Sequence, residues 1–133
     1  MSKAAQVVRA FCEAVSSRDA AALARFFTDD AIYHNMPMAP NIGREAVLAD
    51  LARQFARFTH YEYQVLNLVA DGNTVLTERV DVVGDGSANA PVPVMGTFEL
   101  RDGKIAHWRD YFDRAQSGEL MAAAKAKLGG GGS

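Results

Sequence analysis

The chain has 133 residues, of which 49% are apolar and 23% charged, and its formal net charge is -2, which fits one globular domain with its own core. Its single cysteine, Cys12, excludes an internal disulfide framework and a multi-cysteine zinc site, and we expect it to be a small packing residue. The mild acidic balance argues against nucleic acid and anionic membranes as partners, and without a membrane span or a signal peptide the sequence predicts a cytoplasmic protein.

The first half of the sequence predicts three helices and one short strand. Apolar residues at helical spacing predict a helix over residues 2–16, and a second, short helix over about 19–27, where Asp19 can cap the free N–H groups. Residues 31–36 have the pattern of a short strand, which Pro37 and Pro40 end. A third helix follows Gly43, because apolar residues recur there over about four turns: Val47, Leu48, Leu51, Phe55 and Phe58.

The second half predicts four strands, over residues 61–69, 74–83, 92–101 and 104–113, which are rich in β-branched and aromatic residues. Asp-Gly pairs stand in the three joints between them, and this dipeptide favours tight hairpins, so we expect an antiparallel meander. Residues 116–128 predict a terminal helix with Ser117 as its cap. Residues 129–133 read GGGGS, the composition of an engineered flexible linker, and the domain is therefore assigned to residues 1–128.

Three helices followed by a curved, mostly antiparallel sheet form an α+β arrangement. A strongly bent sheet that wraps around a long helix leaves a cone, and the open end of the cone is a pocket. An apolar pocket with a few convergent polar groups is where we expect the chemistry.

Side chains alternate between the two faces of a strand, and this places Asp110 between Trp108 and Phe112 on an apolar face of the last strand. A buried carboxylate is costly unless it is hydrogen-bonded, ion-paired or protonated. Asp110 is therefore either a structural buried acid or a functional one, and spacing alone does not separate the two. The opposite face, which we expect to be exposed or to meet a partner, carries Ile105, His107, Arg109, Tyr111 and Asp113.

A second pair of charges lies in the strand over residues 74–83. Arg79 and Asp81 share a face there with Val75, Thr77 and Val83, and they are about 7 Å apart along the backbone. Arg79 can therefore lie between Asp81 and a carboxylate of a neighbouring strand. The alternative is a surface ion pair worth about 0–1 kcal/mol, and the apolar neighbours on the same face argue against it.

Tyr33 and Asn35 share one face of the first predicted strand, where a phenol and an amide can both hydrogen-bond one water molecule. Taken alone, a packed tyrosine and a strand-ending asparagine are the simpler interpretation. The three histidines are scattered without metal-ligand spacing, so no metal is expected. Two acids, a bridging arginine and the Tyr33/Asn35 pair in an apolar pocket can donate one proton while removing another.

The sequence resembles the limonene-1,2-epoxide hydrolases, a family of the SnoaL-like group within the NTF2-like fold. Three segments carry the resemblance, in the order of the family: Ile32-Tyr33-His34-Asn35-Met36-Pro37, Thr77-Glu78-Arg79-Val80-Asp81-Val82 and Trp108-Arg109-Asp110-Tyr111-Phe112-Asp113. The resemblance covers nearly all of the chain up to about residue 115. Identical residue types match all five catalytic positions of the family: Tyr33, Asn35, Arg79, Asp81 and Asp110.

This resemblance implies that water opens an epoxide in one step and gives a vicinal diol. Asp110 would take a proton from a water molecule that Tyr33 and Asn35 hold. Asp81 would protonate the epoxide oxygen, and Arg79 would keep the protonation states of the two aspartates distinct. No metal or organic cofactor is implied. Because the family forms homodimers, we expect a homodimer, with the odd-numbered face of the last strand as one candidate contact surface.

We expect the substrate to be an apolar cyclic or aliphatic epoxide, because the residues predicted to line the pocket are apolar. The predicted substrate-binding residues are Met36, Leu51, Phe55, Leu68, Val80, Met95, Phe98, Trp108 and Phe112, with Met38 and Leu100 as further candidates for the pocket wall.

Two other functions stay open. A ketosteroid-isomerase-like or polyketide-cyclase-like enzyme on the same fold would use one acid as a proton shuttle and would not need a pair of aspartates bridged by Arg79. A non-catalytic pocket-binding domain is disfavoured, because two aspartates and an arginine in an apolar pocket lower stability without a chemical return.

Overall fold

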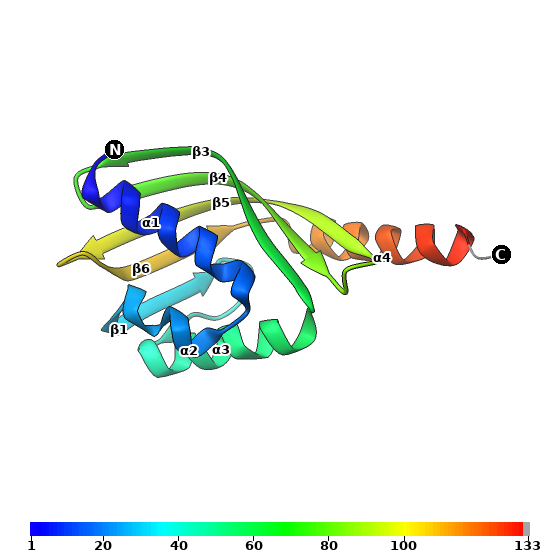
Figure 1. Ribbon diagram of the computed structural model, residues 1–133, viewed down its shortest axis with the longest axis horizontal. Helices are drawn as coiled ribbons and strands as arrows, with labels where there is room; N and C mark the ends of the chain where they lie inside the picture. The colour runs from blue at the N-terminus through cyan, green and yellow to red at the C-terminus, as the bar shows by residue number, and fades with distance from the viewer. Residues whose placement is uncertain (132–133) are drawn as a thin grey trace.

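The computed structural model describes residues 1–131, in which four α-helices and two 3₁₀ turns surround one six-stranded sheet (Figure 1). The helices are α1 (Lys3–Ala14), α2 (Ala20–Leu23), α3 (Arg44–Arg57) and α4 (Arg114–Gly131), and the 3₁₀ turns are η1 (Val15–Ser17) and η2 (Ala24–Phe26). The strands are β1 (Phe27–Asn35), β2 (Asn41–Ile42), β3 (His60–Asp71), β4 (Thr74–Gly84), β5 (Asn89–Arg101) and β6 (Lys104–Tyr111).

The strands follow the order β2-β1-β6-β5-β4-β3 across the sheet. Strands β3 to β6 form the predicted antiparallel meander. Gly72 and Gly103 stand in two of its turns with positive φ angles of 59° and 77°, which glycine adopts without strain. Strand β1 joins the meander by pairing in parallel with β6, and this register sets Asn35 opposite Asp110.

Several element boundaries differ from the prediction in the first half of the chain. The predicted second helix is divided into α2 and the 3₁₀ turn η2, which ends at Phe26. Strand β1 already begins at Phe27, because its ladder with β6 starts there, opposite Ile105. Strand β2 was not predicted, since its two residues are too few to show a period. Phe58 follows α3 as its C-cap and is not part of the helix. Asp19 caps α2 as predicted, because its side chain accepts from the Ala22 N–H group at 3.2 Å.

The terminal helix begins earlier and ends later than predicted. The Asp113 side chain accepts from the Gln116 N–H group at 3.0 Å, so Asp113 is the cap, and the prediction of Ser117 is wrong. Ser117 lies inside α4 and is buried. Helix α4 reaches Gly131 and so includes the first residues of the predicted linker 129–133, whose last two residues lie outside the described part of the chain. None of the helices within residues 1–131 is long and apolar enough to cross a membrane.

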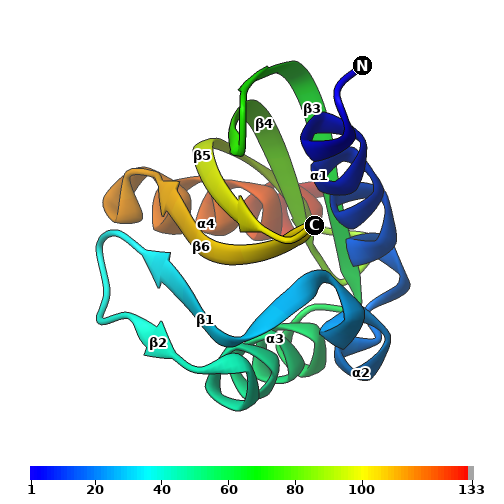
Figure 2. The same ribbon diagram turned by 90° about the vertical axis from the view of Figure 1, so that its left-hand side faces the viewer.

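Aromatic side chains fill the closed end of the curved sheet. Helix α1 packs against β3, α3 against β1 and α4 against β5 (Figure 2). Phe11 of α1 meets the Trp108 ring edge-on at 5.0 Å, and the Trp108 ring stacks between Tyr33 at 3.8 Å and Phe98 at 5.6 Å. Each of these burials contributes about 1.5–3 kcal/mol relative to an exposed ring. Cys12, expected to be a packing residue, is buried beside them.

A β-bulge changes the faces of β6 at its start. The pairing with β5 passes from Glu99 opposite His107 to Leu100 opposite Ile105, which leaves Ala106 as an extra residue. Ile105 is therefore fully buried, and its prediction on the exposed face is wrong. After the bulge the predicted alternation holds, since Trp108 and Asp110 are buried and Tyr111 is exposed.

Candidate active site

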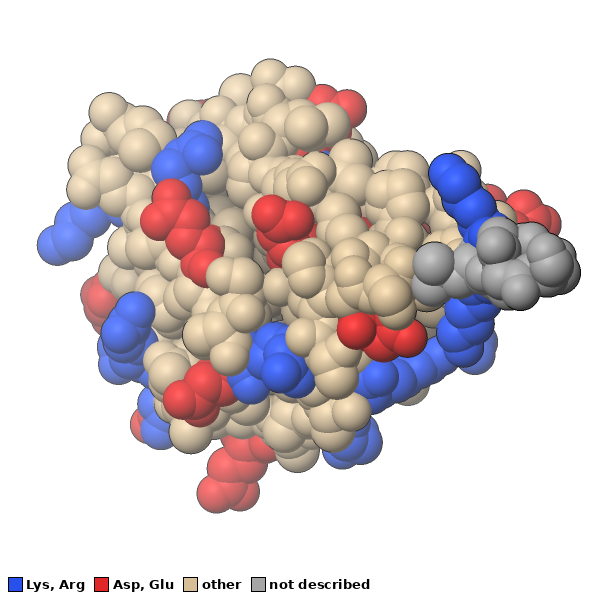
Figure 3. Space-filling view, turned by 45° about the vertical axis from the view of Figure 1, so that its right-hand side comes forward, with Lys and Arg blue, Asp and Glu red and all other residues tan. Residues whose placement is uncertain are grey.

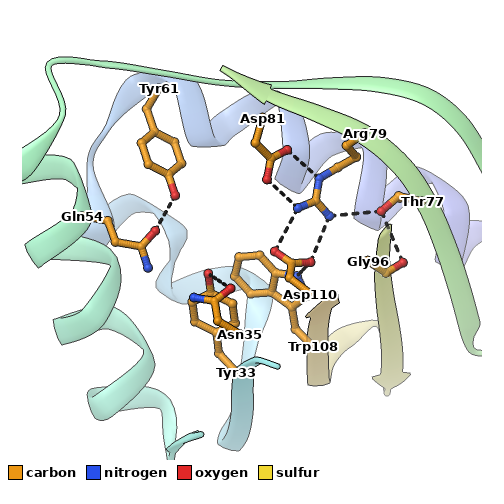
Figure 4. A network of polar contacts seen from close by, with 10 residues as sticks. All are labelled: Tyr33, Asn35, Gln54, Tyr61, Thr77, Arg79, Asp81, Gly96, Trp108 and Asp110. Atoms are coloured by element: carbon orange, nitrogen blue, oxygen red, sulfur yellow. Dashed lines mark hydrogen bonds and ion pairs between the residues drawn. The ribbon is translucent and has the colours of Figure 1, made fainter. Parts of the chain in front are cut away.

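Arg79 stands at the centre of a buried array of charges. Residues at odd positions of β4 face the concave side of the sheet, which places Thr77, Arg79 and Asp81 in one row. The Arg79 guanidinium donates to Asp81 through Nε at 2.9 Å and Nη2 at 2.8 Å, and to Asp110 through Nη1 at 3.1 Å and Nη2 at 2.9 Å (Figure 4). Each aspartate is thus held in a bidentate pair, and the Nη2 atom contacts both of them.

Thr77 and Tyr63 contact the guanidinium of Arg79, and the absence of a side chain at Gly96 leaves space for it. Nη1 of Arg79 also donates to Thr77 Oγ1 at 3.1 Å, and the Thr77 hydroxyl in turn donates to the Gly96 carbonyl oxygen at 3.3 Å. All five N–H donors of Arg79 therefore have acceptors. The ring of Tyr63 lies 4.3 Å from the guanidinium carbon. A Cβ atom at Gly96 would lie 2.3 Å from Nη1, so this position requires glycine.

Asp110 accepts a further hydrogen bond from the core. The Trp108 Nε1–H group donates to Asp110 Oδ1 at 2.7 Å, and the stacking of the Trp108 ring between Tyr33 and Phe98 fixes the direction of this donor. The Asp110 carboxylate is 2% exposed and is oriented from two sides. Its remaining lone pairs are directed by the fold and not by solvent.

Burial and charge act on Asp81 and Arg79 in opposite directions. Burial raises the pKa of Asp81 to about 6, although the Arg79 charge opposes the rise. For Arg79, burial by itself favours the neutral form, but Asp110 and Asp81 outweigh it and raise the pKa well above its usual value. The array therefore combines a permanent cation with a carboxyl group that can hold a proton near neutral pH.

Tyr33 and Asn35 lie beside this array on the neighbouring strand. The Tyr33 hydroxyl donates to Asn35 Oδ1 at 3.1 Å, which leaves the Asn35 amide nitrogen as a donor and the phenol oxygen as an acceptor. Burial raises the pKa of Tyr33 well above its usual value, so the phenol is neutral. The parallel register with Asp110 places Asn35 on the same side of the sheet as the carboxylate.

The structure adds polar residues that the sequence did not single out. The Tyr61 hydroxyl donates to Gln54 Oε1, and Gln54 Nε2 donates to Asp50 Oδ2 at 2.7 Å. Asp50 in turn pairs with Arg53 at 3.0 Å, so the chain of contacts runs from the cavity to the surface. The sequence signal was weak: Tyr61 and Tyr63 resemble core aromatics of a strand, and Gln54 lies beside the apolar face of α3.

These groups open into a cavity of about 480 Å³, a size suited to a small organic ligand. Its polar floor is formed by Tyr33, Asn35, Asp81 and Asp110. The remaining lining residues, mostly from α3, β3, β5 and α4, are Met38, Asp50, Arg53, Gln54, Arg57, Phe58, Tyr61, Tyr63, Val83, Val92, Val94, Phe112, Arg114, Ser117, Gly118 and Met121. The five predicted catalytic residues therefore meet at one cavity, Arg79 from behind its two aspartates.

Most of the predicted pocket-wall residues lie elsewhere. Phe112 and Met38 line the cavity, but the prediction is wrong for Met36, Leu51, Phe55, Leu68, Val80, Met95, Phe98, Leu100 and Trp108. Leu51, Phe55, Phe98, Leu100 and Trp108 are buried in the core, and Leu68 packs against it. The Val80 and Met95 positions alternate to the outer face of the sheet, and Met36 lies in the turn after β1. For Phe98 and Trp108 the reason is that α1 fills one end of the cone, so their rings pack against Phe11 instead of facing the opening.

Within residues 1–131, no group of three or more His, Cys, Asp or Glu residues is arranged to hold a metal ion.

A family model, a curated relative and a solved structure indicate the same family. The model of the limonene-1,2-epoxide hydrolase catalytic domain matches residues 2–121. The epoxide hydrolase EphG of Mycobacterium tuberculosis is 35% identical over 106 residues, which are 80% of this chain and 70% of that protein. The structure of an LEH-like epoxide hydrolase from the same organism matches with a TM-score of 0.84 at 31% identity, over 95% of this chain and 94% of that one.

A proposed SnoaL-like polyketide cyclase from Shewanella putrefaciens has a TM-score of 0.82 at 16% identity, over 92% of this chain and 98% of that one. At this identity the match concerns the fold alone, which is the NTF2-like cone with an open sheet.

Proposed function

Because the chain belongs to the limonene-1,2-epoxide hydrolase family, we propose that it adds water to an epoxide in one step, by acid and base catalysis, and releases a vicinal diol. The observation that carries the proposal is the buried Asp81–Arg79–Asp110 array at the floor of the cavity. Two carboxyl groups on one guanidinium can hold different protonation states, as push-pull catalysis requires.

Asp110 is the general base of the proposed reaction. A water molecule donates hydrogen bonds to Asp110 and to the Tyr33 oxygen and accepts one from the Asn35 amide, which directs a lone pair of the water at an epoxide carbon. As the new C–O bond forms, one water proton passes to Asp110. The contacts of Asp110 with Arg79 and Trp108 support this role, because they fix the carboxylate before the substrate arrives.

Asp81 is the general acid. An epoxide is strained, but its alkoxide is a poor leaving group unless the oxygen is protonated while the C–O bond breaks. A carboxyl group with a pKa near 6 can supply that proton, and acid and base assistance each contribute about 10²–10⁴-fold to the rate.

The array resets itself after each turnover. Once the diol has formed, Asp110 carries a proton and Asp81 is ionised. The facing oxygen atoms of both aspartates lie within 2.9 Å of the same Arg79 nitrogen, so a short transfer through a water molecule returns the proton to Asp81. The net reaction consumes one water molecule and one epoxide.

The substrate we propose has an apolar cyclic or aliphatic body, as limonene-1,2-epoxide does. The support is the apolar part of the cavity lining, which includes Val83, Val92, Val94, Phe112 and Met121.

The test replaces each aspartate by its neutral isostere. We expect Asp81→Asn and Asp110→Asn each to lower diol formation from cyclohexene oxide by about 10²-fold or more, while thermal unfolding shows a folded protein. Asp50→Asn is the matched control, since Asp50 lines the same cavity but has no role in the mechanism. Near-normal turnover in either active-site variant would remove the acid–base assignment.

A single turnover in ¹⁸O-labelled water separates direct attack from a covalent route. Direct attack puts the label into the first diol formed, whereas an ester intermediate puts it into an enzyme carboxylate. Isomerisation of an unsaturated ketone without uptake of label, and without diol from epoxides, would instead favour the isomerase-like alternative.

A further inference from the structure

The opening of the cavity carries arginines that hydrolysis of a neutral epoxide does not need. Arg53 and Arg57 lie in the second half of α3, and Arg114 is the first residue of α4. All three line the cavity that contains Asp81 and Asp110, but they are exposed whereas the two aspartates are buried. Figure 3 shows basic side chains gathered at the lower right of one face of the molecule.

Two of these arginines, Arg57 and Arg114, take no part in the ion pairs of the cavity. Asp50 is paired with Arg53, and both Asp81 and Asp110 are paired with Arg79. Every carboxylate of the wall is therefore paired with an arginine, and Asp81 and Asp110 share one of them. Among residues 1–131, neither Arg57 nor Arg114 has a carboxylate within 4.0 Å. Two cations without counter-ions therefore line one cavity, on a chain whose net charge is -2.

Helix stability explains the presence of a cation at Arg57 but not at Arg114. Arg57 lies in the last turn of α3, where a cation interacts favourably with the helix dipole. Arg114 lies in the first turn of α4, where a cation is unfavourable, and the Asp113 cap is the acidic group beside it.

We propose that the preferred substrate is an amphipathic epoxide whose apolar body ends in an anionic group, such as a carboxylate, which Arg57 and Arg114 bind. This inference rests on the proposed function and names its substrate class. The epoxide reaches Asp81 and Asp110 at the floor, the body lies against Phe112 and Met121, and the carboxylate remains at the exposed opening. Arginine suits this contact because its planar fork matches a carboxylate.

The effect on affinity is moderate because the contact is partly solvated. An exposed ion pair changes affinity by about two- to fivefold, so the two arginines together account for roughly tenfold. Salt should reduce this preference, since screening acts on exposed charges.

Binding is tested first, without chemistry, using undecanoate and its neutral amide undecanamide as probes in titration calorimetry at neutral pH. We expect undecanoate to bind about tenfold more tightly, and Arg57→Gln combined with Arg114→Gln to abolish the difference without weakening undecanamide. Arg25→Gln is the matched control, because Arg25 is exposed and lies outside this cavity. Equal affinity of the two probes for the unaltered protein overturns the proposal.

Turnover is then compared for 10,11-epoxyundecanoate and 10,11-epoxyundecanamide. We expect a KM about tenfold lower for the acid at similar kcat, and a loss of this advantage in the double variant with kcat preserved. Diol from both epoxides with equal KM values overturns the substrate class and leaves epoxide hydrolysis in place. If neither epoxide gives diol while undecanoate still binds selectively through Arg57 and Arg114, the hydrolase proposal fails and the anion site stands.

Discussion

Arg79 allows two carboxyl groups to be buried together at the floor of the cavity. Removing charges from water costs several kcal/mol per ion. The attraction between opposite charges in the interior offsets this cost only when all of their hydrogen bonds are made. The five satisfied donors of Arg79 meet this condition, and Thr77 and Trp108 complete the network. An isolated Asp81 at the same depth would be driven to its neutral form, because burial raises its pKa.

The pKa of Asp81 leads to a prediction for pH dependence. Burial raises this pKa from 3.8 to about 6, and a general acid acts only while it is protonated. We therefore expect kcat/KM for a neutral epoxide to fall about tenfold per pH unit above pH 6. Because the folded pKa exceeds the unfolded one, the same carboxyl contributes stability below about pH 4 that is lost as the pH rises through 6. A rate profile that is flat between pH 6 and 9 would contradict the role of Asp81.

Gly96 provides a second prediction at the scale of single residues. In Gly96→Ala the new methyl group would lie 2.3 Å from Arg79 Nη1 and 2.7 Å from Asp110 Oδ1, so the guanidinium must leave one of its partners. We expect a loss of about 1–3 kcal/mol in the free energy of unfolding and at least a tenfold loss in kcat. Urea denaturation and steady-state kinetics measure the two effects, and an alanine variant with normal kcat would show that the array tolerates displacement.

The catalytic candidates could be predicted from sequence because a strand has a period of two. Parity alone placed Arg79 with Asp81, and Asp110 with Trp108, and both placements hold. The roles of these residues stay predictions until tested. Gln54, Tyr61 and the apolar wall could not be predicted in this way, since their place at the cavity depends on how the helices pack against the sheet.

Among the elements, local signals predicted the meander well and long-range pairing poorly. Asp-Gly turns join neighbouring strands, so β3 to β6 follow from the sequence of their own joints. The parallel pairing of β1 with β6 joins segments far apart in the chain, and no local pattern announces it. No local sequence pattern predicts the bulge at Ala106, and because of this bulge Ile105 is buried where we expected it to be exposed.

Helix α4 contains a glycine that weakens it. Gly118 lies inside the helix, and nothing lies within 4 Å of the position that a Cβ atom would take. We expect Gly118→Ala to raise the free energy of unfolding by about 0.5–1 kcal/mol, because alanine loses less backbone entropy in a helix. Urea denaturation of both variants should show opposite changes in the free energy of unfolding, an increase for Gly118→Ala and a decrease for Gly96→Ala. A destabilised Gly118→Ala protein would mean that α4 is less regular than described.

At the scale of the whole molecule, the outer face of the sheet carries exposed apolar residues that could contact a second copy of the chain. Leu76, Met95 and Tyr111 are 41%, 50% and 46% exposed there, and Met95 stands opposite Tyr111 in the β5–β6 ladder. Exposed apolar residues that lie together favour a protein contact. We propose that two copies of the chain associate through this face, which includes part of the odd-numbered face of β6.

Sedimentation velocity tests this assembly. We expect a dimer for the unaltered protein at micromolar concentration and a monomer for Met95→Lys, because a lysine at the centre of the contact would be buried without a partner. Ile42→Lys is the control, since Ile42 is also an exposed apolar residue but lies on the edge strand β2. A monomeric unaltered protein would remove the proposal.

The reacting groups and the opening of the cavity belong to different parts of the architecture. Asn35, Asp110, Gly96 and Thr77 are successive partners across four strands of the sheet. Asp81 lies on the same strand as Thr77 and is the partner of Tyr63 on β3. Arg57, Arg114 and Met121 are carried by helices. New specificities can therefore be selected by exchanging helix side chains, while the chemical step is inherited unchanged with the ladder beneath it.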